Sequence, residues 1–262
     1  MISFSIITIS YNASEVIQPT LDSVFSQDYP HVEHLIVDGA SKDDTIAMAQ
    51  SYKSKNDASG GGHVVVISSE PDKGLYDAMN KGLQLATGDY VLFLNAGDCL
   101  AAADTLSRVA GAATVGDGEQ LPVVIYGDTD VYDADGRYVG PRHLSVPEHL
   151  TWRSFRRGML VCHQAFYALR EVAAVEPYNL DYRLSADVDW CIRVMHRGEN
   201  EGRSLKNVHG VVCHYLEGGM SIQNHRASLK ERFHIMRSHY GLFSTLLWHC
   251  WFFVRQILRT KN

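Results

Sequence analysis

The 262-residue sequence predicts an α/β fold with a mostly parallel central sheet flanked by helices. In the first hundred residues, four short apolar or β-branched segments alternate with segments of helical periodicity. Each apolar segment also ends abruptly in polar residues. Strands that alternate with helices form parallel sheets, because each crossover helix carries the chain back to the same end of the sheet.

The bulk composition is that of an ordinary globular protein. The length, an apolar fraction of 45% and a charged fraction of 21% fit one large domain with a C-terminal appendage. A net charge of -6 gives no reason to expect a nucleic-acid partner. The five cysteines are odd in number and lack a CxxC pair, so they indicate neither disulfides nor a zinc site. We therefore expect a cytoplasmic location, and a first strand rather than a signal peptide.

Four strands are expected in the first half, each bounded by glycine, proline or polar residues. They span residues 3–9, 32–37, 64–68 and 90–94. Helices are expected between them, at residues 14–26, 43–53 and 75–86. Ser14 can cap the first helix, and Gly88 follows the last as a C-terminal signal. The polar, glycine-rich residues 53–62 are typical of a surface loop.

The second half is less regular. Its expected elements are strands at 122–126, 162–167 and 207–214, helices at 101–113 and 186–196, and a hairpin turn at 133–136. Ser185 precedes the helix at 186–196 and can cap it. Two more helices are expected after the last strand, a mixed-charge one at 226–240 and an apolar one at 242–258.

Polar residues follow each strand of the first half, chief among them Tyr11, Asp38, Asp72 and Asp98. Because the carboxyl ends of parallel strands lie at one edge of a sheet, we expect these side chains to converge there. Each has a simpler role when taken alone: packing for the tyrosine, and turns or a helix cap for the aspartates. Their convergence on one edge favours a binding site.

The chemistry of these residues indicates a nucleotide-diphosphate site. Carboxylates at a sheet edge suit Mg²⁺ or Mn²⁺, which prefer oxygen ligands and often use substrate phosphates as well. Tyr11 offers a stacking face for a base, and Asp38 can accept a hydrogen bond from a base imide or a ribose hydroxyl. The sequence lacks GxGxxG after its first strand and GxxxxGK[ST] anywhere, so a dinucleotide fold and a P-loop NTPase are disfavoured.

Four motifs resemble the family 2 glycosyltransferases, which have the GT-A fold. They are SIITISYN at 5–12, LIVDGASKDDT at 35–45, SEPDKGLYDAMNKG at 69–82 and ATGDYVLFLNAGD at 86–98. The likeness is greatest to bacterial enzymes that build capsular, exopolysaccharide or colanic-acid-type repeat units. It predicts a GT-A domain at 1–225, with a nucleotide-sugar-binding half at 1–100 and an acceptor-side half at 101–225. Residues 226–262 would form a C-terminal helical extension.

The resemblance implies transfer of a sugar, with inversion, from a UDP- or GDP-sugar to a hydroxyl of a glycan or lipid-linked acceptor. Tyr11 and Asp38 then fall at base-binding positions, and Asp72 lines the nucleotide pocket. Residues 95–98 occupy the family's Asp-x-Asp-Asp position, but Asn95 and Gly97 replace two of its acids. Asp98 is left as the expected ligand for Mg²⁺ or Mn²⁺, and Asn95 as a substrate-binding residue.

The resemblance also places residues on the acceptor side. Asp187, at the start of the helix at 186–196, matches the family's acidic motif and is the expected general base, with Asp189 as the second choice. A charge that complements the helix dipole is the simpler role for Asp187. His163 and Gln164 resemble a motif that lines the acceptor or diphosphate site. His214 is a further candidate metal ligand.

Two other functions stay open. A nucleotidyltransferase also uses a nucleotide-binding α/β sheet, but its glycine-rich, basic phosphate loop is absent after the first strand. A nucleotide-sugar-binding module without catalysis is the second alternative, and the glycine at position 97 keeps it open.

The apolar residues 242–258 set the C-terminus apart. This run is shorter than the roughly 20 apolar residues of a spanning helix, and His249 interrupts it. Its tryptophans and phenylalanines favour a helix that lies on the inner face of the plasma membrane or docks on a partner. Packing against the protein's own core is the alternative.

Overall fold

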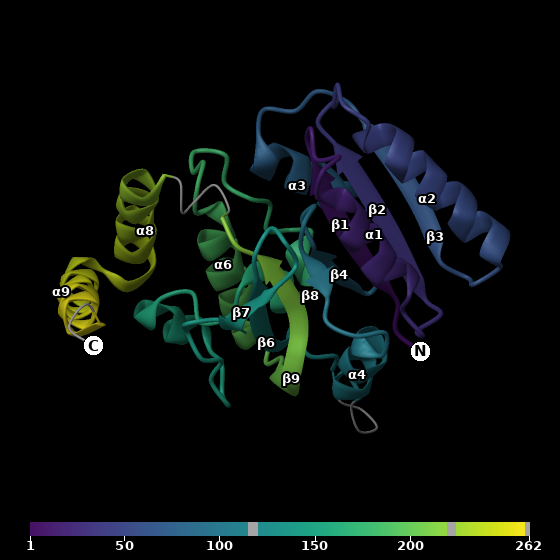
Figure 1. Cartoon of the computed structure of the whole chain (residues 1–262). Coiled ribbons are helices and arrows are strands. Elements are labelled where there is room, and N and C mark those ends of the chain that lie inside the picture. The colour runs from purple at the N-terminus through teal and green to yellow at the C-terminus, as the bar shows by residue number, and fades with distance from the viewer. Residues whose placement is uncertain (115–119, 219–223, 260–262) are drawn as a thin grey trace.

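The computed structural model describes residues 1–114, 120–218 and 224–259 and shows one mixed sheet with helices against both faces (Figure 1). The strand order is β3-β2-β1-β4-β8-β6-β9-β5, and β7 pairs with β6 beside this path. The expected α/β fold with a mostly parallel sheet is therefore confirmed.

The first half of the chain forms the parallel part of the sheet. Its strands are β1 (Phe4–Ser10), β2 (Val32–Asp38), β3 (Val64–Ser69) and β4 (Tyr90–Phe93). Its helices are α1 (Ile17–Phe25), α2 (Thr45–Ser59) and α3 (Leu75–Leu85). Side chains of β2 alternate between faces, since Ile36 packs in a cluster with α1 and α2 while Leu35 and Val37 pack in the cluster that includes α3.

The second half adds both parallel and antiparallel strands. They are β5 (Cys99–Leu100), β6 (Val124–Tyr132), β7 (Tyr138–Pro141), β8 (Phe166–Leu169) and β9 (Leu205–Leu216). The helices are α4 (Thr105–Ala112), α5 (Arg170–Ala173) and α6 (Ala186–Asn200), with 3-10 turns η1 (Trp152–Arg157) and η2 (His163–Ala165). Strand β8 lies antiparallel between β4 and β6, so it joins the two halves of the chain in one sheet.

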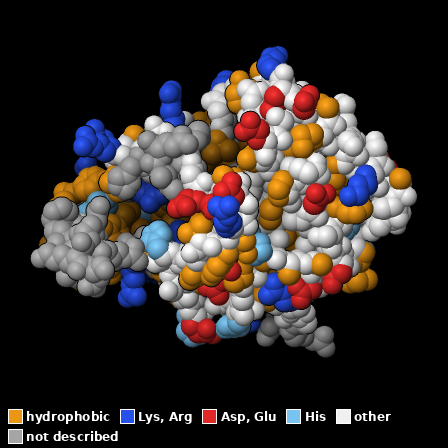
Figure 2. Space-filling model, in the orientation of Figure 1, with side chains coloured by type: hydrophobic (Ala, Val, Ile, Leu, Met, Phe, Trp, Pro, Cys, Tyr) orange, Lys and Arg blue, Asp and Glu red, His pale blue; other side chains and the backbone are white. Residues whose placement is uncertain are grey.

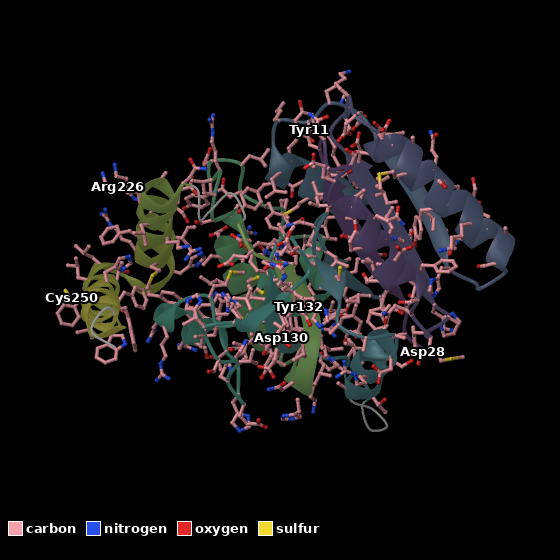
Figure 3. All side chains as sticks on the ribbon, viewed as in Figure 1. Tyr11, Asp28, Asp130, Tyr132, Arg226 and Cys250 are labelled. Carbon is pink, nitrogen blue, oxygen red and sulfur yellow. The ribbon has the colours of Figure 1, made fainter. Side chains whose placement is uncertain are left out.

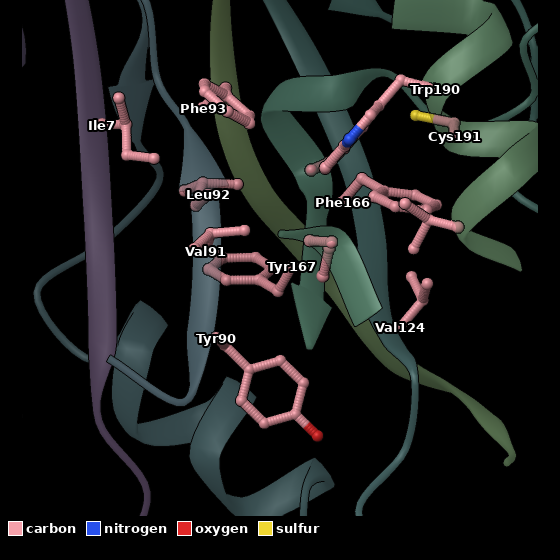
Figure 4. Close-up of a cluster of buried hydrophobic side chains, with 14 of the residues drawn as sticks. Ile7, Tyr90, Val91, Leu92, Phe93, Val124, Phe166, Tyr167, Trp190 and Cys191 are labelled. Carbon is pink, nitrogen blue, oxygen red and sulfur yellow. The ribbon is translucent and has the colours of Figure 1, made fainter. Parts of the chain in front are cut away.

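The core is centred on β4, whose four residues are all buried. Figure 4 shows Leu92 and Phe93 of β4 between Ile7 of β1 and the aromatic side chains of β8 and α6. Trp190 of α6 packs edge-on against Phe93, with ring centroids 5.5 Å apart, and stacks on Tyr178 at 4.9 Å. This aromatic cluster fixes α6 against the end of β4.

Several expected boundaries were wrong. Residues 163–165 form η2 instead of a strand, because the amide of Ala165 closes a tight turn on the carbonyl of Cys162. Residues 53–59 continue α2, which ends at a left-handed Gly60 with φ of 67°. Strand β5 was missed because two residues carry no periodic signal. Ser14 does not cap α1, which begins at Ile17.

Helices α8 (His225–Tyr240) and α9 (Leu242–Arg259) lie at one end of the molecule, away from the parallel strands (Figure 1). They correspond to the predicted C-terminal extension. Within the described ranges, no helix is both long enough and apolar enough to cross a membrane. In Figure 2, hydrophobic side chains gather over this end of the molecule, beside several arginine or lysine side chains.

Candidate active site

One end of the site lies where β1, β2 and β3 finish. Asp38 is buried, and its carboxylate accepts hydrogen bonds from the hydroxyls of Ser10, Ser41 and Ser69 and from the amide of Ser41. Ser10 ends β1, and Ser69 ends β3. Because these bonds use all the lone-pair positions of the carboxylate, Asp38 ties the three strand ends together.

Tyr11 and Asp72 meet over Gly39. A Cβ on Gly39 would lie 2.5 Å from Oδ2 of Asp72 and 3.2 Å from Cδ2 of Tyr11, so a larger residue there would push the Asp72 carboxylate out of its place. The ring of Tyr11 is 65% exposed beyond the end of β1 (Figure 3). Asp72 accepts a hydrogen bond from the amide of Gly74, just before α3. This cluster presents an open aromatic face beside a carboxylate.

The segment after β4 continues along the same edge. The amide of Ala96 donates to the carbonyl of Ile9, so residues 95–98 run beside the end of β1. Gly97 has a φ of 102°, a conformation that residues other than glycine rarely adopt. The backbone conformation of this turn therefore explains why a glycine stands at position 97. The turn closes with the amide of Asp98 on the carbonyl of Asn95.

Asp98 is buried between neutral donors. Its Oδ2 accepts from Nε2 of Gln164 at 2.9 Å, and its Oδ1 accepts from the amide of Leu216 at 3.0 Å. Burial is the largest influence and raises the pKa of Asp98 to about 6, although these two hydrogen bonds and the charge of His163 oppose it. The site therefore holds a carboxylate whose charge is poorly compensated.

A line of hydrogen bonds crosses the site from η2 to α3. Nδ1 of His163 lies 3.3 Å from Oδ2 of Asp187, and the hydroxyl of Tyr76 donates to Oδ1 of Asp187 at 3.1 Å. On the other side of the ring, Nδ2 of Asn95 lies 3.2 Å from Nε2 of His163. Nδ1 of His163 thus faces a carboxylate and Nε2 faces an amide, so the two partners hold the ring in one orientation.

The charge state of Asp187 differs from that of Asp98. Burial tends to raise the pKa of Asp187, but the hydrogen bond and charge of His163, the charge of Arg232 and the amide of Val188 outweigh it. The pKa of Asp187 therefore lies below its usual range, and the carboxylate is ionised at neutral pH. An ionised carboxylate in contact with the site is what a general base needs.

The expected residues thus fall into two groups at one sheet edge. In the first group, polar contacts join Asn95, His163 and Asp187 in one line, and Asp98 pairs with Gln164 beside it. Tyr11, Asp38 and Asp72 form the second group, next to the end of β1.

Asp189 and His214 are placed differently. Asp189 accepts from Nε of Arg193 at 2.8 Å and from Nε2 of His239 at 2.7 Å, so its carboxylate links α6 to α8. His214 pairs in the β5–β9 ladder with Cys99, the residue that follows Asp98. The ring centroids of His214 and Tyr132 are 4.5 Å apart. Burial lowers the pKa of His214, which favours the neutral ring that a metal ligand requires.

Two residues of the site were not singled out from the sequence. Tyr76 lies within the SEPDKGLYDAMNKG motif, but its contact with Asp187 joins positions 111 residues apart. Arg232 lies on the inward face of α8, where the buried Ser228 and Ile235 precede and follow it at helical spacing. That spacing is the signal that could have identified Arg232.

The residues present fit a metal ion only if a substrate supplies most of its ligands. Among the described residues, no three His, Cys, Asp or Glu side chains are grouped so as to hold an ion. Asp98 offers a carboxylate, and Oδ1 of Asn95 is buried without a hydrogen-bond partner. These two oxygens suit Mg²⁺ or Mn²⁺ completed by phosphates and water.

Fold and site together define a glycosyltransferase of the GT-A class. The solved structure of residues 1–349 of TarS from S. aureus, in complex with UDP-GlcNAc, has a TM-score of 0.65 and 16% identity, and the match covers 90% of this chain and 64% of that fragment. The mannosyltransferase PcManGT from Pyrobaculum calidifontis, in complex with GDP-Man and Mn²⁺, has a TM-score of 0.66 and 16% identity, and covers 95% of this chain and 70% of PcManGT. At this identity, both likenesses show the fold alone.

The family model described as Glycosyl transferase family 2 matches residues 5–175, and the chain belongs to this family. The PGL/p-HBAD biosynthesis glycosyltransferase of Mycobacterium tuberculosis (strain ATCC 25177 / H37Ra) is 39% identical over 220 residues, which cover 83% of this chain and 78% of that protein. The expected family and the GT-A fold are thereby confirmed.

The raised pKa of Asp98 predicts that Asp98→Asn stabilises the metal-free protein at pH 8 and changes its stability little at pH 3.5. A raised carboxyl pKa contributes stability below the unfolded value of 3.8 that is lost as pH rises through about 6. The neutral amide avoids this loss, and Gln164 can turn its own amide to accept from it. We expect a gain of about 1–3 kcal/mol at pH 8.

The measurement is the free energy of unfolding in urea at both pH values with a chelator present. Asp181→Asn, which changes an exposed aspartate, is the matched control. A difference between Asp98→Asn and wild type that does not depend on pH would contradict the expected charge penalty.

Proposed function

We propose that this protein is an inverting glycosyltransferase that moves a sugar from a nucleotide-diphosphate-sugar to an acceptor hydroxyl. The observation that carries the proposal is the line of contacts from Asn95 through His163 to Asp187, next to Asp98 at the end of β4. It puts an ionised carboxylate close to the strand end where this fold offers a place for a diphosphate. Residues 1–100 would bind the donor, and residues 101–225 the acceptor.

The donor would lie along the ends of β1, β2 and β4. Tyr11 would stack on the base with its exposed ring, and Asp72 would line the pocket beside it. Asp38 would shape the base pocket by holding the loop from 38 to 41, since serine donors already occupy its carboxylate. The complexes of TarS with UDP-GlcNAc and of PcManGT with GDP-Man support a UDP- or GDP-sugar as the donor class.

A divalent cation, Mg²⁺ or Mn²⁺, would be held by Asp98, with Asn95 and His214 as candidate additional ligands. When bound, such an ion neutralises charge on a departing diphosphate. Gln164 positions Asp98 through its hydrogen bond. The Mn²⁺ in the PcManGT complex supports the choice of cation.

Asp187 would act as the general base. As the acceptor oxygen attacks the anomeric carbon, Asp187 takes the hydroxyl proton, and the diphosphate leaves with the bonding electron pair. Attack from the face opposite the diphosphate inverts the anomeric configuration. His163 and Tyr76 hold the carboxylate in position, so that its orientation is set before the acceptor arrives.

The acceptor would be a glycan or a lipid-linked saccharide of the cell surface. The mycobacterial relative is named for PGL/p-HBAD biosynthesis, which supports a glycoconjugate acceptor. All five cysteines are free thiols, which supports a location in the reducing cytoplasm.

Helix α9 would bring the enzyme to the inner face of the plasma membrane. Phe243, Leu247 and Trp251 are 85%, 61% and 50% exposed and lie on one face at helical spacing. A groove of about 410 Å³ beside them is lined by Arg157, Leu160, Trp248 and Trp251. An apolar helix face next to arginines complements a bilayer with anionic headgroups.

Replacing the base should abolish transfer without loss of donor binding. We expect Asp187→Asn to lower kcat by about 10²–10⁴-fold, the usual contribution of a general base, with the donor KM changed less than threefold. The asparagine can keep its contacts with His163 and Tyr76, so the fold should hold. Release of nucleoside diphosphate from UDP- and GDP-sugars measures the effect, with the exposed Asp181→Asn as control.

Wild-type turnover in Asp187→Asn would contradict its role as base. A wild-type protein that binds a nucleotide-sugar but never releases product with any acceptor would instead indicate a binding module.

Loss of the apolar face should weaken membrane binding. Full burial of one large apolar side chain is worth roughly 1.5–3 kcal/mol, so the double change Phe243→Ser and Leu247→Ser should lower partitioning at least tenfold. Sedimentation with vesicles of phosphatidylcholine and phosphatidylglycerol measures it. The control is Val139→Ser with Val175→Ser, which removes similarly exposed side chains elsewhere. Equal sedimentation of both double variants would contradict the membrane proposal.

A further inference from the structure

We propose that Arg232 of α8 binds the diphosphate of the nucleotide-sugar and stabilises it as it departs. This assignment rests on the proposed function, because it concerns the same donor. It gives α8, which lies outside the region matched by the family, a direct part in the reaction.

The position of α8 is fixed at three points along its inward face. Glu231 accepts from the amides of Arg183 and Leu184 at 2.9 and 2.8 Å, immediately before α6. The hydroxyls of Ser228 and Ser185 lie 3.1 Å apart, and His239 contacts Asp189 at 2.7 Å. These contacts hold the inner face of α8 against the helix that carries Asp187.

Arg232, on this inward face of α8, has no hydrogen-bonded or ion-paired partner of its own among the described residues. Its Nε is buried and has no hydrogen-bond partner, and no ion pair of its guanidinium occurs within the part of the chain that is described. The adjacent carboxylate of Glu231 is already taken by two backbone amides. Arg232 is nonetheless near enough to Asp187 for its charge to lower the pKa of that carboxyl.

The charge balance of the site indicates what this cation binds. Asp98 is buried and Asp187 is partly buried, and a nucleotide-sugar adds a diphosphate whose negative charge grows as the sugar leaves. With Asn95 and Gly97 in the metal motif, the protein offers few carboxylates to hold a cation there. An arginine fork can supply positive charge directly and donate two parallel hydrogen bonds to phosphate oxygens.

The test compares each nucleoside diphosphate with the nucleoside that lacks its phosphates. Wild type, Arg232→Gln, Arg232→Lys and Arg237→Gln are titrated calorimetrically with UDP, GDP, uridine and guanosine. Arg237 is an exposed arginine on the same helix, and so provides the matched control. We expect Arg232→Gln to weaken binding of the preferred diphosphate about 10- to 100-fold, as loss of a charged hydrogen bond does, and nucleoside binding less than twofold. Arg232→Lys should be intermediate.

Each result is decisive. Equal diphosphate affinity in Arg232→Gln and Arg237→Gln overturns the assignment. A raised acceptor KM with unchanged diphosphate affinity would assign Arg232 to acceptor binding, and it overturns the assignment as well. Should Arg232→Gln fail to fold, wild-type diphosphate affinity and kcat in Arg232→Lys would overturn the bidentate role. If wild type binds nucleosides and diphosphates equally, the assignment fails while the base site stands. If it binds none of the four ligands, the proposed donor class itself fails.

Discussion

The contact between His163 and Asp187 is the interaction on which the site depends. It joins η2, which lies beside the end of β4, to the first turn of α6, and so connects the two halves of the chain. Burial alone would favour the protonated acid at Asp187, but the donor at Nδ1 keeps the carboxylate ionised. Asn95 contacts the other ring nitrogen and so helps to hold the ring against Asp187.

The surroundings of Asp98 and Asp187 give these two acids opposite charge preferences. Asp187 has His163 and Arg232 near it, and its pKa falls, while Asp98 has mainly neutral donors, and its pKa rises to about 6. When a carboxylate is costly to ionise in the free protein, a bound cation stabilises its charged form most strongly. Sugar transfer from a diphosphate requires both an ionised carboxylate that can act as base and a second carboxylate that can bind a cation.

The parallel half of the fold could be predicted because its signals are local. Each of β1 to β4 is a continuous apolar or β-branched run, and the polar residues after these strands do gather at one edge. The line from Asn95 to Asp187 could not be derived from spacing, since it depends on β8 entering antiparallel between β4 and β6. The engagement of Asp189 by α8 and the placement of Arg232 likewise come from packing between distant helices. The family resemblance selected Asp187, but only the structure supplied partners for it.

A crystal structure of the protein with an unreactive phosphonate analogue of its nucleotide-sugar tests most directly whether the site works as proposed. The predicted complex has the base against Tyr11, the diphosphate between Asp98 and Arg232, and Asp187 on the opposite side of the anomeric carbon from the diphosphate. A nucleotide bound away from the ends of β1 and β4, or Asp187 on the same side as the diphosphate, would contradict both the donor site and the inverting mechanism.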